Sequence, residues 1–299
     1  MAATAPPPLL LRGLVKDYGP LHAVRGIDLE VRAGEVFGFI GPNGAGKSTT
    51  IRCILDLLRP TAGRVEVFGL DPRHDGVAIR RRVTYVPGEL RLPERTTARR
   101  LLESIGNLRG GFDRHRLDEL AERFKLDLGR PIRHLSSGNR RKVSILSAFL
   151  TDAELLILDE PTGGLDPLMQ HEFLALVSER RAAGATIFLS SHILSEVQRV
   201  ADRLAVLRAG VIVAEGTVNE VRGRARQRVQ IWFEGDAPPG LTAVPGLEGA
   251  VIQGRHFAAT LSGSVQPLLD ALAGKQVTTM LVEDPDLEDA FLDLYAGDA

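Results

Sequence analysis

The residue types best suited to chemistry form a short glycine-rich run that could hold a chain of phosphates. It matches the phosphate-loop pattern G-x-x-x-x-G-K-[ST] at each fixed position and comprises Gly41, Pro42, Asn43, Gly44, Ala45, Gly46, Lys47, Ser48 and Thr49. Glycines let the backbone curl so that several N–H groups point at one anion, and a following helix adds the positive end of its dipole. In this pattern Lys47 is expected to reach the β- and γ-phosphates and Ser48 to place its hydroxyl on Mg²⁺. The run therefore predicts a site for a nucleoside triphosphate with its magnesium ion.

A pair of acidic residues farther along the chain could complete such a site. Asp159 and Glu160 follow the apolar run Leu155–Leu158, which predicts a buried strand. Ligands gather at the carboxyl ends of strands in sheets of this kind, so Asp159 is expected near the magnesium held by Ser48. Glu160 is expected to face the γ-phosphate and to polarise an attacking water. The alternative is a strand that simply ends in two solvated acids.

Such a site needs a parallel sheet that brings these distant segments to one edge. From residue 155 to residue 201, strand and helix patterns alternate, which implies a parallel sheet with helices on its faces. Residues 206–214 predict a hairpin. The earlier patterns predict an antiparallel pair of strands, then the strand and helix around the glycine-rich run, then further helices, in residues 9–15, 24–31, 35–40, 49–58, 97–124 and 139–150. Gly110–Gly111 divides the stretch 97–124 into two helices. The sequence therefore predicts an α/β fold.

Composition limits where the protein works and what it binds. Its 299 residues carry a net charge of −1, so no large basic surface is expected and nucleic acid is not a predicted partner. Cys53 is the only cysteine, which excludes an internal disulfide and suits a reducing cytoplasm. No apolar stretch approaches the roughly 20 residues that cross a bilayer. We expect a cytoplasmic protein whose membrane-spanning partner, if it has one, is a separate chain.

The character of the sequence changes near residue 221. A basic connector and patterns for two strands and two helices follow, in residues 222–226, 229–233, 256–261, 265–272 and 287–295. Roughly 75 residues of mixed character are enough for a small appended domain, near the lower size limit for independent folding. We therefore expect two domains, residues 9–220 and residues 226–299, of which the second is a small α+β domain.

Four further segments make residues 9–220 resemble a known family, the ATP-binding subunits of ABC transporters. Leu135–Asn139 is similar to the family's signature motif, usually Leu-Ser-Gly-Gly-Gln, and it lies just before a predicted helix. Gly164–Pro167 resembles the D-loop, Ser190–His192 resembles the switch-histidine motif, and Tyr18 stands where the family has an aromatic residue that stacks on adenine. The resemblance implies a P-loop ATPase domain with an N-terminal antiparallel β subdomain and a helical signature subdomain.

In this family two ATP-binding domains pair head to tail, and the resemblance implies the same homodimer here. ATP would lie between the phosphate loop of one subunit and the signature residues of the other, which are Ser136, Ser137 and Gly138. His192 is then expected to hydrogen-bond the γ-phosphate, and Asp166 to communicate across the dimer interface. ATP would hold the two subunits together, and hydrolysis would weaken that contact.

Two departures from the family pattern bear on activity. Ser137 stands where the signature usually has a glycine, and Asn139 where it has glutamine. Ser137 adds a Cβ near the expected γ-phosphate and also offers a hydroxyl donor. Gly88 aligns with the glutamine of the family's Q-loop and has no side chain to touch magnesium or water, whereas Glu89 could substitute only if it faced the metal. Gly88 therefore puts coupling to a membrane partner in question. Hydrolysis is still expected, because the predicted catalytic residues Glu160 and His192 are both present.

The arrangement of motifs narrows the kind of ABC protein. A single set of motifs is present, whereas translation-associated members carry two. About 90 residues separate Lys47 from Ser136, too few for the long coiled coil of chromosome-maintenance and break-repair members. The tail, residues 286–294, looks like the ending of ATP subunits from ABC-2 type exporters, including drug and antibiotic exporters. The resemblance implies a subunit at the cytoplasmic face of the membrane that energises export through a separately encoded ABC-2 type permease. In such a system the permease, and not this chain, contacts the transported molecule.

Other interpretations remain open at this point. A regulatory module would use the same ATP-driven dimerisation without transport, and the departures at Ser137 and Gly88 favour it. A small-molecule kinase is disfavoured because Glu160 and the D-loop suit activation of water. The apolar face of the tail fits closure of the small domain's own core as well as docking to a partner; it comprises Leu287, Ala290, Phe291 and Leu294.

Overall fold

Two units of structure make up the chain, Met1–Glu215 and Gly216–Ala299, and each has its own apolar core. The computed structural model describes residues 5–222 and 227–283. The larger unit contains all the residues of the predicted site, and its arrangement explains how they meet.

The site is built on a six-stranded sheet in the larger unit. In spatial order the strands are β5 (Val83–Val86), β6 (Leu155–Asp159), β7 (Thr186–Ser191), β3 (Val36–Ile40), β8 (Arg203–Arg208) and β9 (Val211–Thr217). The strands from β5 to β8 run parallel, so their carboxyl ends share one edge. Every residue of β3, β6 and β7 is buried, as expected for apolar strands covered on both faces. The predicted α/β fold is confirmed, and the loops after these three strands meet at the shared edge.

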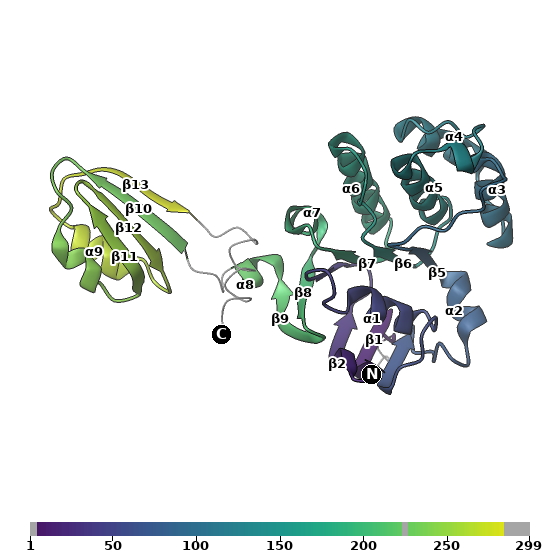
Figure 1. Ribbon diagram of the computed structural model, residues 1–299, viewed down its shortest axis with the longest axis horizontal. Coiled ribbons are helices and arrows are strands. Elements are labelled where there is room, and N and C mark those ends of the chain that lie inside the picture. Colours follow the sequence, from purple (N-terminus) through teal and green to yellow (C-terminus); the bar gives the residue numbers. More distant parts are fainter. Residues whose placement is uncertain (1–4, 223–226, 284–299) are drawn as a thin grey trace. The chain divides into compact units, whose positions relative to one another are not determined.

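Helices cover both faces of this sheet. Figure 1 shows α1 (Lys47–Ile54) on one side, and α6 (Pro167–Ala182) and α7 (Leu194–Val200) on the other. Pro167 suits the first turn of α6 because its φ is fixed near the helical value and its missing N–H is not needed there. The predicted helices after the phosphate loop, the D-loop and the switch histidine are thus confirmed, with small shifts at their ends.

A second sheet is antiparallel and contains the two paired strands that were predicted before the phosphate loop, together with one strand that follows α1. Its strands lie in the order β2 (Leu21–Val31), β1 (Leu9–Tyr18) and β4 (Ala62–Val67). The first two strands are longer than predicted, and only Gly19–Pro20 separates them. Their inward apolar side chains join α1 and the larger sheet in one core. This sheet places Tyr18 at the end of β1, beside a tight turn.

Along the chain, a helical region separates the phosphate loop from the acid pair Asp159–Glu160. It comprises α2 (Gly76–Arg82), α3 (Ala98–Leu108), α4 (Arg114–Arg123), the short 3₁₀ turn Ile132–His134 and α5 (Ser137–Phe149). α3 and α4 are separate helices, as Gly110–Gly111 predicted, and both contact α5. The sequence did not predict α2, because this helix buries only Ile79 and has no side-chain cap.

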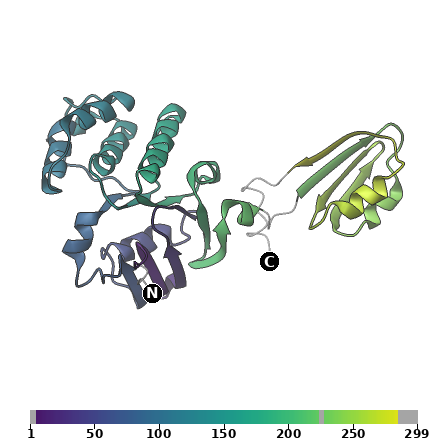
Figure 2. The same ribbon diagram turned by 180° about the vertical axis from the view of Figure 1, so that it is seen from behind.

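The smaller unit is an antiparallel sheet with one helix packed on it, which is visible from both sides in Figures 1 and 2. It contains α8 (Val218–Arg222), β10 (Gln227–Phe233), β11 (Leu247–Gln253), β12 (His256–Leu261), α9 (Gln266–Leu272) and β13 (Val277–Glu283). The strands lie in the order β11-β12-β10-β13. The predicted α+β class is confirmed, but β11 and β13 were not predicted. The tail helix expected at residues 287–295 lies outside the described residues.

None of the helices in the described part of the chain combines the length and apolar character that crossing a bilayer requires.

Candidate functional site

The phosphate-loop sequence folds into a tight turn between β3 and α1. Gly46 has φ 108°, and a Cβ there would lie 2.4 Å from the carbonyl oxygen of Ala23. At Gly41 a Cβ would lie 2.3 Å from the carbonyl oxygen of Leu207. Only glycine therefore fits at these two positions. The loop is pressed against β2 and β8, while Pro42 stays exposed at its tip.

Lys47 is the first residue of α1, and its ammonium points back into the loop. The side chain is 5% exposed. Its Nζ donates hydrogen bonds to the carbonyl oxygens of Gly41 at 2.6 Å and Pro42 at 3.1 Å. It also lies 3.0 Å from Oε1 of Glu160, on the loop after β6. The structure thus brings together two predicted groups that lie more than 100 positions apart in sequence. Ser48 and Thr49 follow Lys47 in the first turn of α1.

The acid pair is held by the neighbouring strand β7. Asp159 is buried, and its Oδ1 accepts a 2.6 Å hydrogen bond from Oγ of Ser190. The backbone N–H of Glu160 donates to Oγ of the same serine at 3.2 Å and to its carbonyl oxygen at 3.1 Å. Glu160 has φ 47°, a left-handed conformation that side chains other than glycine seldom adopt and that is common at functional sites. The two carboxylates therefore leave the strand in different directions, each with its own partners.

Glu160 connects the two predicted phosphate-contacting side chains. Its Oε2 lies 2.5 Å from Nδ1 of His192, while its Oε1 contacts Lys47. A buried ammonium that already pairs with a carboxylate is suited to receive a phosphate anion. Once an anion takes its place on Lys47, the Glu160 carboxylate can accept a proton from water beside that anion. The arrangement can bind an anion and activate a nucleophile a few ångströms away.

The residues also fit a magnesium ion of the kind that nucleotides bring with them. The contact between Lys47 and Glu160 places their neighbours, Ser48 and Asp159, at the same edge of the sheet. No cluster of three metal-binding side chains occurs in residues 5–222 or 227–283. One hydroxyl and one carboxylate suit magnesium, which usually keeps waters and phosphate oxygens as its other ligands.

The remaining predicted residues lie outside this cluster. Ser136 caps α5, where its Oγ accepts from the backbone N–H of Asn139 at 3.3 Å, and Ser137 is exposed beside Gly138 in the first turn. Asp166 caps α6 by accepting from the N–H of Met169 at 3.0 Å. None of the hydrogen bonds or ion pairs among the described residues joins Ser136–Gly138 to the phosphate loop.

Tyr18 also stands apart from the phosphate-binding cluster. The ring is 43% exposed, and the ammonium of Lys16 lies 5.1 Å from its centre. An exposed ring at a strand end is free to stack on a flat ligand.

Three side chains near the site were not assigned from the sequence. Ser190 faces Asp159 because the two residues are register partners in β7 and β6, so strand alignment could have identified it. Arg141 and Glu196 reach the site from helices, and no short-range pattern signals them.

Glu196 is a buried carboxyl group behind the site. Its Oε2 accepts hydrogen bonds from the hydroxyls of Thr162 at 2.8 Å and Ser191 at 3.3 Å. Burial raises the pKa of Glu196 above its ordinary value of 4.5, and these two hydrogen bonds act in the opposite direction. The carboxyl group ties the turn after Glu160 to the residue that precedes His192.

We expect Glu196→Gln to stabilise the fold at pH 8 more than at pH 5. The folded chain holds this proton more tightly than the unfolded chain, so the stabilising contribution is lost as pH rises from 4.5 through the raised pKa. The amide is neutral at every pH, and its oxygen can still accept from Thr162 and Ser191. Thermal unfolding at the two pH values tests this, with the exposed Glu122→Gln as control. An equal change in melting temperature at both pH values would contradict it.

Comparison with known proteins agrees with this geometry. A family profile described as ABC transporter matches residues 24–163. Daunorubicin resistance ATP-binding protein DrrA3 of Streptomyces coeruleorubidus is 36% identical over all of this chain and 98% of its own length. Bacitracin transport ATP-binding protein BcrA of Bacillus licheniformis is 35% identical over 73% of this chain and 72% of its own.

A solved structure described as the ATP-binding subunit of an ABC transporter has 33% sequence identity and a TM-score of 0.66, covering 73% of this chain and 92% of that one. The sequence resemblance, the sheet topology and the phosphate-loop geometry agree. The chain therefore belongs to the ABC transporter family, as an ATP-binding subunit that carries the family's ATPase domain.

Proposed function

We propose that this chain energises export of a small molecule by hydrolysing ATP while bound to a separately encoded permease. The observation that carries the catalytic part is the contact of Glu160 with both Lys47 and His192. Transport is supported by the relative named for bacitracin transport, and export by a relative named for Nod factor export. We further propose that residues 9–220 form the ATP-binding domain and residues 226–299 an accessory domain.

In this proposal each site residue has one task. Lys47 and the loop N–H groups bind the β- and γ-phosphates, Glu160 accepts a proton from the attacking water, and His192 orients the γ-phosphate. Ser48 and Asp159 hold magnesium, which neutralises charge on the phosphates when it is bound. Arrival of the triphosphate must displace the Glu160 carboxylate from Lys47, because both anions use the same ammonium. The same movement frees Glu160 to act as the base.

We propose that two copies of the chain complete the site. Ser136 and Ser137 are exposed at the start of α5, where backbone N–H groups and the helix dipole favour an anion. No phosphate-loop residue of the same chain is hydrogen-bonded to them within the described ranges. A head-to-tail pair would bring the phosphate loop of one subunit to this helix start in the other. Asp166, at the start of α6, and Tyr18, beside the adenine, would then complete each ATP site.

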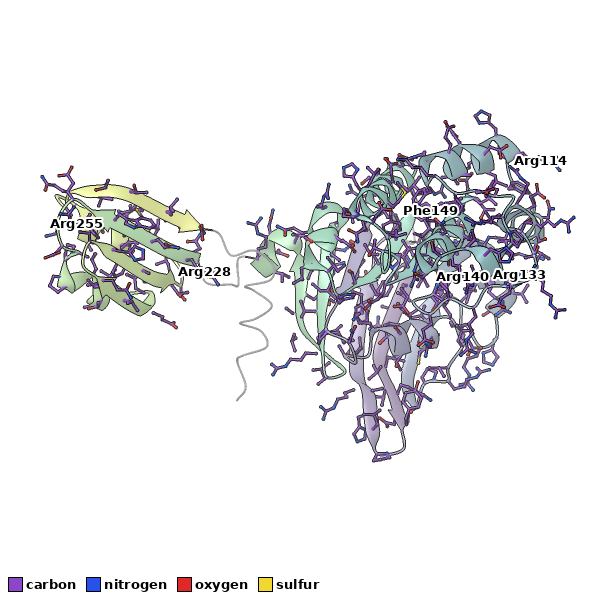
Figure 3. All side chains as sticks on the ribbon, turned by 45° about the horizontal axis from the view of Figure 1, so that its top comes forward. Arg114, Arg133, Arg140, Phe149, Arg228 and Arg255 are labelled. Atoms are coloured by element: carbon purple, nitrogen blue, oxygen red, sulfur yellow. The ribbon has the colours of Figure 1, made fainter. Side chains whose placement is uncertain are left out.

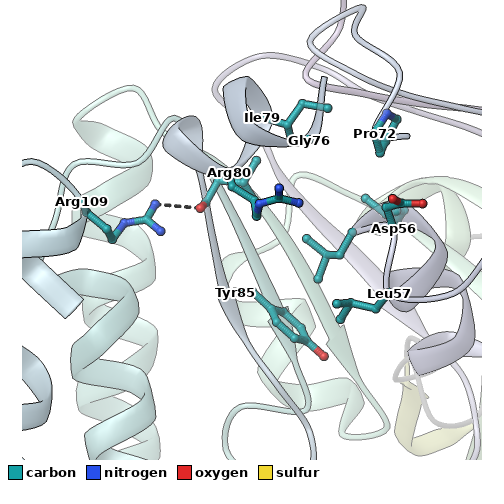
Figure 4. A pocket seen from close by; sticks show the side chains of 11 residues that line it. Asp56, Leu57, Pro72, Gly76, Ile79, Arg80, Tyr85 and Arg109 are labelled. Atoms are coloured by element: carbon teal, nitrogen blue, oxygen red, sulfur yellow. Dashed lines mark hydrogen bonds between the residues drawn. The ribbon is translucent and has the colours of Figure 1, made fainter. Parts of the chain in front are cut away.

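A pocket of about 340 Å³ is the proposed contact for the permease. Figure 4 shows Leu57, Arg80 and Tyr85 around it, and Leu57 is 60% exposed. Burial raises the pKa of Tyr85 to about 12, so its phenol is neutral. Tyr85 belongs to β5, which leads directly into Pro87–Gly88 beside Asp159. A helix end or loop of a permease seated here would press on the segment next to the metal site.

The alternative is an ATP-switched regulatory ATPase that is not coupled to transport. The observation that favours it is Gly88, because a glycine offers the magnesium site no side chain from this segment. In that case dimerisation itself would be the output, and no membrane protein would change the rate of hydrolysis.

Co-expression with a candidate ABC-2 type permease distinguishes the two functions. We expect the permease to recruit the chain to membranes and to stimulate its ATPase activity. Leu57→Glu should abolish most of that stimulation, because an exposed apolar contact becomes a charge, while activity without the permease is unchanged. Leu269→Glu, a matched change at an exposed leucine of α9, should have no effect. ATPase activity that no co-expressed permease stimulates would support the regulatory function instead.

A further inference from the structure

Arg141 makes an unusual connection between α5 and the segment after β5. Its Nη1 donates to the carbonyl oxygen of Pro87 at 2.7 Å, and its Nη2 to the carbonyl oxygen of Gly88 at 2.6 Å. The arginine is half-buried, and its Nε–H is buried without a protein partner among the described residues. Two hydrogen bonds from one planar guanidinium fix both the position and the orientation of this backbone.

The segment held by Arg141 lies directly against the proposed magnesium ligand. A Cβ placed at Gly88 would be 3.3 Å from Oδ2 of Asp159, closer than side-chain contacts usually are. On its other side, Arg141 Nη2 would lie 3.9 Å from a Cβ at Gly163, in the turn after Glu160. The guanidinium therefore sits between two loops that flank the acid pair.

The charge of Arg141 also acts on that acid pair. Burial lowers the pKa of Arg141, whereas the carboxylates of Asp159 and Glu160 act in the opposite direction. Arginine keeps its proton under all ordinary conditions, so the residue places a fixed positive charge near both acids.

The identity of residue 88 explains why such a connection matters here. Glycine has no side chain with which to reach the metal or to hold its own loop in place, and it loses more conformational freedom on folding than other residues. The distance between the backbone of Gly88 and Asp159 therefore depends on a side chain from another segment of the chain. Arg141 is the side chain that supplies two hydrogen bonds to it.

We propose that Arg141 is a positioning residue for ATP hydrolysis, which holds Pro87–Gly88 against Asp159 and so fixes the magnesium carboxylate. The proposal rests on the proposed role of Asp159 in binding magnesium. Because Arg141 lies on α5, one turn after the signature residues Ser136–Gly138, it also ties the magnesium site to the helix that meets the partner's ATP. Movement of α5 then reaches the metal site through the two hydrogen bonds that Arg141 donates to Pro87 and Gly88.

The test compares Arg141→Gln and Arg141→Lys with a neighbouring arginine on the same helix. Arg140→Gln is the matched control, because the Nη2 of Arg140 donates to the carbonyl oxygen of Arg133 at 3.2 Å and not to Pro87 or Gly88. Figure 3 labels Arg140 and Arg133 on the larger unit. The full-length protein is assayed for ATPase rate against Mg²⁺ concentration, nucleotide affinity without Mg²⁺, and melting temperature.

For Arg141→Gln we expect the half-saturating Mg²⁺ concentration to rise about 10-fold and kcat to fall about 10-fold, as is typical when a group that orients a metal ligand is removed. Nucleotide affinity without Mg²⁺ should stay unchanged. For Arg141→Lys, the half-saturating Mg²⁺ concentration and kcat should lie between those of Arg141→Gln and the unaltered protein. An ammonium keeps the charge but cannot donate to both carbonyls in one plane. Arg141→Lys also provides the decisive comparison if the glutamine variant does not fold. Arg140→Gln should match the unaltered protein.

Three results would overturn the role of Arg141. They are a normal Mg²⁺ requirement in both Arg141 variants, a lowered melting temperature as their only change, and an equal shift in Arg140→Gln. A further variant, Asp159→Asn, shows whether the Arg141 role alone is wrong or whether the proposed magnesium site is wrong as well. If Asp159→Asn keeps a normal Mg²⁺ requirement, the magnesium site and the Arg141 role are both wrong. If it raises the requirement while Arg141→Gln does not, only the Arg141 role is wrong.

Discussion

Glu160→Gln is expected to bind ATP at least as tightly as the unaltered protein and to lose turnover by about 10²- to 10⁴-fold, the range typical of a general base. The amide keeps the shape of the side chain but cannot accept a proton from water. It also carries no charge to compete with the phosphates for Lys47, which the carboxylate contacts at 3.0 Å. Phosphate release and binding of a fluorescent ATP analogue measure the two effects separately.

A surface glutamate provides the control for this prediction. Glu179→Gln removes a carboxylate that pairs with Arg123 on the outside of the larger unit, and it should leave both rate and affinity unchanged. Turnover of Glu160→Gln within about threefold of the unaltered rate would mean that another group activates the water. A loss of ATP affinity as large as the loss of rate would mean that Glu160 contributes to binding rather than to the chemical step.

Lys47→Ala is expected to weaken ATP binding about 10- to 100-fold, since a hydrogen-bonded charge of this kind contributes about 1.5–3 kcal/mol. The buried ammonium is fixed by two loop carbonyls, so its charge is already aimed at the place where phosphates are expected. Its loss also leaves Glu160 without its cationic partner, so two negative groups would face each other. Equilibrium binding of the ATP analogue measures the change.

The matched control is Lys275→Ala, an exposed lysine of the smaller unit, which should bind ATP normally. Melting temperatures of both variants separate a binding defect from unfolding. If Lys47→Ala folds and binds ATP with unchanged affinity, then the glycine-rich run is not the phosphate site.

The phosphate loop and its flanking elements could be predicted because their signals are local. The glycines at positions 41, 44 and 46 and the lysine at 47 follow from one short pattern, and strand and helix periodicity frame it. Asp159 and Glu160 were predictable for a similar reason, since an apolar strand points them to the carboxyl edge of a parallel sheet. The structure adds that this edge is shared by β3, β6 and β7.

The contacts that depend on distant segments were not predictable from the sequence alone. Arg141 meets Pro87–Gly88 across more than 50 positions of the chain, and only the packing of α5 beside β5 brings them together. The elements α2 and β13 were missed because each buries few side chains, so their apolar patterns are weak. Local pattern predicts candidate groups for the chemistry, whereas tertiary packing decides which side chains contact them.

The most direct test of the account is a structure of Glu160→Gln with ATP and Mg²⁺, in an assembly whose size is confirmed in solution by light scattering. We expect a dimer in which Ser136–Gly138 of one subunit contact the γ-phosphate held by Lys47 of the other. A nucleotide-loaded monomer in solution, or a dimer whose signature residues lie far from any γ-phosphate, would contradict it.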